Sequence, residues 1–188
     1  MINVVNSISP KKTVKNIVDT RHSSVGGRLV IDFKAFPKWT HSIRCDDFTN
    51  EFSSAEECSE NLFKLINKLF PYLQEEHKNI FNGAGHCHTI VDSTKNKKKK
   101  AKVNKPRTKV SKIVKQLHGT DLDPSAEVWQ LSYGEGIRLI GVLLSNDKDI
   151  ILYPLFIDQH HIIYPSDSHN QTDMSSASYS FRPQERYY

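Results

Sequence analysis

Four residues toward the end of the chain have the side-chain types that metal-independent cleavage of RNA requires. That reaction needs a base for a 2′-hydroxyl, a cation for the charge that develops on the phosphate, and an acid for the leaving oxygen. Histidine can act as base and acid near neutral pH, and arginine can bind a phosphate through two parallel hydrogen bonds. The candidate catalytic set is Arg138 for the phosphate, His160 or His161 as acid and base, and Tyr164 to orient them.

Three β-rich runs must position these residues. They cover 128–133, 137–144 and 150–158, and the turns that join them are so short that neighbouring strands must be antiparallel. Because the start of one strand then meets the end of the next at one edge of the sheet, we expect Arg138 to lie close to 158–161. The alternative is purely structural: Arg138 pairs with Asp158 to tie two strands together, and His160 and His161 form an ordinary strand exit.

A lysine-rich strip is the second candidate site. Residues 95–115 contain ten Lys, one Arg and no acidic residue, while the remaining 15 basic and 21 acidic residues of the chain balance to −6. Such a strip attracts nucleic acid by releasing counterions. We therefore expect RNA as a partner, bound by Lys97, Lys98, Lys99, Lys100, Lys102, Lys105, Arg107, Lys109 and Lys112. A solubilising loop, or a surface for an acidic protein, is the alternative interpretation.

His86, Cys87 and His88 form a third constellation. On a strand, alternate residues share one face, so the two imidazoles could bind zinc together with His118 or the pair at 160–161. A structural zinc site usually shows two short-spaced ligand pairs in sequence, and this chain has one, so we favour local polar packing. The sequence has no P-loop, GxGxxG, HExxH, GxSxG or EF-hand pattern, and we predict no metal and no cofactor.

The length of 188 residues predicts a single domain. No apolar stretch approaches the roughly 18 to 20 residues that span a bilayer, and the first residues do not resemble a secretory signal, so we expect a cytoplasmic protein without a membrane partner. Three cysteines without CxxC spacing are typical of a reducing compartment.

The remaining pattern predicts an α+β fold. Arg28–Phe36 alternates like a strand, two Ser-x-x-Glu patterns at 53–57 predict the start of a helix that Pro71 ends, and a second helix is expected from Pro106 to Gly119. The first strand and the three-strand meander should form an antiparallel sheet, packed by two or more helices. We divide the chain into an N-terminal extension (1–25), the α+β domain (26–165) with a basic insertion at 92–107, and a polar, disordered tail (166–188).

This order of elements resembles the RelE/ParE-like toxin fold over roughly residues 28–165. The stretch Trp129–Gly141 (WQLSYGEGIRLIG) is similar to the family's strand, Gly-acidic turn and arginine-bearing strand, and Leu155–Tyr164 (LFIDQHHIIY) to its last strand. The resemblance implies a toxin-type mRNA endoribonuclease of a toxin-antitoxin or phage-defence system. Such an enzyme acts on RNA that can be ribosome-associated, and an acidic antitoxin neutralises the enzyme.

The chain departs from that family where Gln130 and Ser132 replace additional basic residues on the strand before the turn. This departure favours an alternative: a non-enzymatic adaptor or inhibitor that binds nucleic acid or an acidic protein through the lysine-rich strip.

Overall fold

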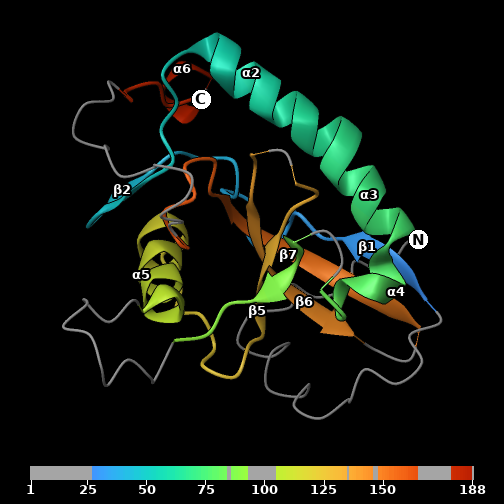
Figure 1. The fold of residues 1–188 in the computed structure, drawn as a ribbon. Helices are drawn as coiled ribbons and strands as arrows, with labels where there is room; N and C mark the ends of the chain where they lie inside the picture. Colours follow the sequence, from blue (N-terminus) through green and yellow to red (C-terminus); the bar gives the residue numbers. More distant parts are fainter. Residues whose placement is uncertain are drawn as a thin grey trace, which may run out of the picture.

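The computed structural model describes residues 27–83, 86–92, 105–134, 136–145, 148–164 and 179–187. Within these residues, five strands form one mixed sheet in the order β1-β7-β6-β5-β4 (Figure 1). The strands are β1 (Arg28–Ile31), β4 (His88–Thr89), β5 (Val128–Leu131), β6 (Leu139–Ser145) and β7 (Asp149–Ile157). The predicted meander is confirmed, because β5 pairs with β6 and β6 with β7 in antiparallel register.

Helices cover both faces of this sheet, which explains why β6 and β7 are apolar almost throughout. Successive residues of β6 point to opposite faces, so Ile140 and Val142 join one core while Leu139 and Leu143 join the other. The first core is closed by α5 (Pro106–His118), and the second by the long helix that runs across the sheet in Figure 1.

Strand β1 corrects the prediction of a purely antiparallel sheet, because it pairs with β7 in parallel. It also ends at Ile31 rather than Phe36, and Phe33 is exposed. An alternating pattern shows that a segment is a strand but carries no information on its direction. The chain between β1 and β7 includes all the other strands of the sheet and is long enough to permit either orientation.

The helix that begins near residue 54 continues past Pro71, contrary to the prediction. It comprises α2 (Ala55–Lys64), a π-helical turn η2 (Leu65–Leu69) and α3 (Phe70–Glu75). Proline lacks the N–H that a regular helix uses, and the wider π-turn directly before Pro71 accommodates that loss. The turn also rotates the apolar stripe: Leu65, Leu69 and Leu73 are buried, but Ile66 is 57% exposed. The predicted serine cap is confirmed, since the Ser54 hydroxyl accepts from the Glu57 amide.

Two glycines meet specific backbone needs. Gly119 follows α5 at the position where the sequence predicted the helix to end, and it adopts the left-handed conformation with φ of 71°. Gly141 lies at an irregularity between β6 and β7, where an added Cβ would come within 2.7 Å of the Leu152 side chain. The close approach of these two strands therefore depends on a residue without a side chain.

Short elements complete the described fold. They are the antiparallel hairpin β2 (Arg44–Cys45) and β3 (Phe48–Thr49), and the helices α4 (His77–Ile80) and α6 (Gln184–Tyr187). Part of the segment predicted to be a disordered tail packs against this hairpin region: Phe181 forms an antiparallel bridge with Phe52, and Gln184 bonds to both backbone polar groups of Ser42. For residues 179–187 the prediction of a disordered tail is therefore wrong, because partners distant in sequence bond to this segment.

Candidate functional site

Arg138 and Asp158 lie at the same edge of the sheet, as the meander predicts. The Asp158 amide donates to the Arg138 carbonyl oxygen at 2.8 Å. The Arg138 guanidinium is half-buried and donates from Nη1 to the Ser132 hydroxyl at 2.9 Å and to the Ile137 carbonyl at 3.2 Å. Burial lowers the pKa of Arg138, while the charge of Asp158 opposes the shift. Ser132 is thus a hydrogen-bond partner of Arg138.

The Asp158 carboxylate organises the chain that leaves β7. It is fully buried and accepts the backbone N–H groups of Ile162 at 3.0 Å and Ile163 at 2.9 Å. Burial raises the pKa of this carboxyl, against the effect of the two amides and of His161 and His160. Between these contacts, His161 adopts a positive φ of 57°. Asp158 therefore closes a tight strand exit.

The other candidate catalytic residues diverge from this point. The His161 ring bonds through Nε2 to the carbonyl of Gly136, two residues before Arg138 in the chain. The His160 ring instead donates to the Glu51 carbonyl at 2.8 Å and lies against the Tyr179 ring. The Tyr164 hydroxyl contacts the Val91 amide at 3.1 Å. The structure thus brings together Arg138 and His161, and it directs His160 and Tyr164 toward different partners.

Glu51 is a buried charge that the sequence did not reveal. Its side chain is 1% exposed, and its carboxylate accepts from Arg44 Nε and Arg182 Nε, each at 2.5 Å. Arg182 lies 131 positions away in the chain. No local pattern could have indicated this triad, because its members come from the hairpin region and from the segment at 179–187.

The lysine-rich strip is described only from Lys105 onward; Lys97, Lys98, Lys99, Lys100 and Lys102 lie outside the described residues. Arg107, predicted to contact RNA, is half-buried and donates from Nη2 to the carbonyls of Asp123 at 2.9 Å and Ala126 at 3.2 Å. Burial lowers its pKa, while Asp92 and Asp123 oppose the shift. In the structure, Arg107 holds the chain that follows α5 to the start of that helix.

Asp92 joins the two flanks of residues 93–104. Its Oδ1 atom accepts the Arg107 amide at 2.8 Å, and its Oδ2 atom accepts the Thr108 hydroxyl at 2.6 Å. A carboxylate at this position satisfies free N–H groups in the first turn of α5 and is favoured by the helix dipole. The chain therefore enters and leaves the lysine-rich stretch at nearly the same point.

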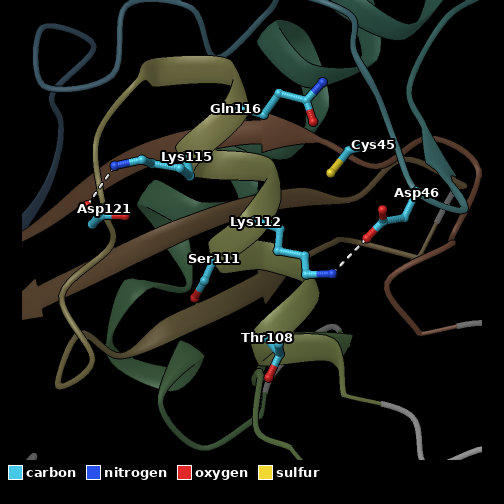
Figure 2. A pocket seen from close by; sticks show the side chains of 8 residues that line it. All are labelled: Cys45, Asp46, Thr108, Ser111, Lys112, Lys115, Gln116 and Asp121. Atoms are coloured by element: carbon cyan, nitrogen blue, oxygen red, sulfur yellow. Dashed lines mark hydrogen bonds and ion pairs between the residues drawn. The ribbon is translucent and has the colours of Figure 1, made fainter.

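Three lysines along α5 form ion pairs with aspartates of neighbouring turns. Lys109 Nζ lies 3.0 Å from Asp47, Lys112 Nζ 2.9 Å from Asp46, and Lys115 Nζ 2.7 Å from Asp121. The hydrogen bond to Asp46 raises the pKa of Lys112. Figure 2 shows the latter two pairs beside an open hollow of about 500 Å³, lined by Cys45, Asp46, Thr108, Ser111, Lys112, Lys115, Gln116 and Asp121.

The His86–His88 region is occupied by packing contacts. The Gln130 amide contacts His88 Nε2 at 3.1 Å, and the buried Cys87 thiol contacts the Ser132 carbonyl at 3.5 Å. Burial raises the pKa of Cys87. His118 donates to the Leu155 carbonyl on the α5 side of the sheet. The described part of the chain holds no group of three or more His, Cys, Asp or Glu side chains suited to a metal ion.

Comparison with known proteins places the chain in a family. The family described as Uncharacterised protein UU032 matches residues 34–187, and the chain belongs to it. The chain is 29% identical over 184 residues to the Uncharacterized protein UU032 of Ureaplasma parvum serovar 3, in an alignment that covers 96% of this chain and 94% of that protein. No solved structure matches. No helix in the described ranges has both the length and the apolar character needed to cross a membrane.

Proposed function

We propose that the protein binds RNA through the lysine-rich residues 95–105 and does so without cleaving it. Two kinds of support converge on this function. The stretch concentrates positive charge in a chain whose other residues are net acidic, and its flanks meet at Asp92 beside the start of α5. A dense run of lysines neutralises phosphates without reading bases, so the expected binding is strong at low salt and independent of sequence.

The meeting of the flanks at Asp92 is the observation that carries the proposal. It brings the two ends of the lysine-rich stretch together, and six lysines lie between those ends in the sequence. Local concentration of like charge favours a polyanion over a small anion, because several phosphates can be neutralised by one encounter.

The test is the salt dependence of RNA binding, measured by fluorescence anisotropy with a short labelled single-stranded RNA. Replacing Lys97, Lys98, Lys99 and Lys100 by Gln should reduce the slope of log affinity against log salt by about 3, at roughly 0.7 per phosphate contact. The matched control replaces four exposed lysines elsewhere, Lys34, Lys38, Lys78 and Lys148, with the same change in net charge. If both variants weaken binding equally, the proposed site is wrong.

A second candidate is metal-independent RNA cleavage by a divergent RelE-like toxin, for which an acidic antitoxin would be the protein partner. The observation that favours it is the proximity of Arg138 and His161 at one end of β6. The cleavage hypothesis can be tested by expressing the protein in bacteria and measuring their growth. A nuclease centred on these residues should arrest growth, and Arg138→Ala or His161→Ala should relieve the arrest while His160→Ala retains it. If growth is normal and labelled RNA stays intact after incubation with the purified protein, cleavage is excluded and RNA binding without cleavage is retained as the proposed function.

A further inference from the structure

The outward side of α5 carries further lysines, which follow the lysine-rich stretch in the sequence. Lys109, Lys112 and Lys115 are spaced three residues apart along the helix, which begins at the point where Asp92 joins the flanks of 93–104. We call these three residues the lysine row. Lys112 and Lys115 line the hollow in Figure 2, together with Thr108 and Ser111, whose hydroxyl groups are bonded to Asp92 and to Arg107. Cationic groups along one face are suited to a chain of phosphates.

The aspartates that pair with the lysine row are held in place by the fold. Asp46 and Asp47 form the turn between β2 and β3, and the neighbouring residues Cys45 and Phe48 are buried in the core beneath α5. The Gln116 side-chain amide also donates to the Arg44 carbonyl at 3.0 Å, which joins the hairpin to the helix. The two carboxylates therefore face the lysines in a fixed position.

The ion pairs of Lys112 and Lys115 are open to solvent, with 60% and 55% of these side chains exposed. Lys109 is 19% exposed and also donates to the Ile162 carbonyl at 3.4 Å, so in that pair the aspartate is the solvated partner. The side chains of Asp46, Asp47 and Asp121 are 63%, 72% and 74% exposed. Exposed pairs are weak because water and salt compete with each partner. A phosphate of higher charge density can therefore replace the carboxylates at Lys112 and Lys115 without any rearrangement of buried groups, and can reach Lys109 from the side that the exposed Asp47 occupies.

We propose that Lys109, Lys112 and Lys115 form a second phosphate-binding site for RNA, which Asp46, Asp47 and Asp121 occupy as phosphate mimics in the free protein. The proposal rests on RNA being the ligand of the neighbouring lysine-rich stretch. Binding exchanges aspartate for phosphate at each lysine, so the carboxylates lower the affinity for RNA and restrict it to ligands that bring several phosphates.

The decisive variant removes the competing carboxylates while the lysines stay. Asp46→Asn with Asp47→Asn keeps the size of both side chains, and asparagine accepts the positive φ of 54° that Asp46 adopts. We expect this double variant to bind the labelled single-stranded RNA about three- to tenfold more tightly, as loss of two exposed competing pairs allows. The matched control is Glu60→Gln with Glu75→Gln on the helix across the sheet, which changes net charge equally and should alter affinity less than twofold.

A second measurement tests the lysines themselves. In the Asp46→Asn, Asp47→Asn background, replacing Lys112 and Lys115 by Gln should reduce the salt slope by about 1.4, at roughly 0.7 per lost contact. Equal affinities of the aspartate variant and its Glu60, Glu75 control would overturn the proposal. So would a salt slope that is unaffected by the two lysine substitutions.

The two proposals fail in different ways. If substitution of Lys97–Lys100 abolishes binding while the variants on α5 behave as wild type, the lysine row is excluded and the proposed function stands. If substitution of Lys97–Lys100 leaves RNA affinity unchanged, while the aspartate variant and the Lys112, Lys115 substitutions alter it as expected, the lysine row is itself the binding site. Absence of RNA binding by the wild type and by the aspartate variant overturns both proposals.

Discussion

Two polar regions of this protein differ in what holds their charged groups. At the strand-end cluster, formed by Asp158, His160, His161 and Tyr164, each side chain bonds to a backbone group of a distant or neighbouring segment. Along the lysine row, each ammonium group pairs with an exposed carboxylate.

This difference separates polar groups that hold the fold together from polar groups that can exchange their partner for a ligand. Asp158 is fully buried and cannot change partner without leaving two backbone donors unsatisfied, which is costly, while the half-buried His160, His161 and Tyr164 are each bonded to the backbone. An exposed ion pair exchanges with water, salt or another anion at little cost. Residue types alone favour the strand-end cluster as the reactive site, whereas burial and bonding make the lysine row the more available surface for a ligand.

The largest effect should follow from Asp158→Ala. The substitution leaves the buried amides of Ile162 and Ile163 without acceptors, so we expect a loss of roughly 2 to 4 kcal/mol in the free energy of unfolding. Urea denaturation measures the loss. Asp121→Ala makes the same chemical change at the lysine row and should leave the urea midpoint almost unchanged. Similar losses in the two variants would refute the contrast between the regions.

His118 sharpens the comparison within α5, because it points inward while Lys115 points outward. Its Nε2 atom donates to the Leu155 carbonyl at 2.8 Å, and its ring meets the edge of Phe36. Burial lowers its pKa below the ordinary value of 6.5. The unfolded chain therefore binds a proton more readily, so the stability that neutral His118 contributes is present above pH 6.5 and is lost as the pH falls through the lowered pKa.

Denaturation curves recorded from pH 7.5 down to pH 5 would measure this loss. His118→Gln retains a side-chain donor but no titrating group, so its stability should vary less with pH than that of the wild type. Parallel pH profiles of wild type and variant would show that His118 has the same pKa in the folded and unfolded states, contrary to expectation.

The smallest effect on stability is expected from Asp46→Asn with Asp47→Asn, the variant with the largest expected gain in RNA affinity. Both carboxylates are solvated, so the thermal midpoint should stay within the error of the measurement. Differential scanning calorimetry checks this. A clear fall in the midpoint would mean that the turn contributes to the fold and is not free to exchange its partners.

Several features of the fold followed from local patterns. The meander followed from short turns between apolar runs, and the contact between the Asp158 amide and the Arg138 carbonyl followed from the meander. The end of α5 at Gly119 followed from the left-handed conformation that glycine adopts most readily. In each case the physical cause acts over a few residues or through one hairpin, so the chain order contains the information.

Other features depended on partners far apart in the chain. The parallel pairing of β1, the burial of Glu51 between Arg44 and Arg182, and the docking of Phe181 against Phe52 all join distant segments. Neither the periodicity of hydrophobic residues nor the composition predicts which distant segment a strand will pair with or which distant charge a side chain will contact.

By itself, the sequence determined the capped start of the long helix at Ser54, the extent of α5, the antiparallel meander and the concentration of lysines at 95–115, because propensity, turn length and charge are local properties. Only the tertiary structure decided which polar side chains are available. Burial and long-range hydrogen bonds assign His160 and Tyr164 to backbone partners, and they leave the lysine row facing carboxylates that solvent and phosphate can reach.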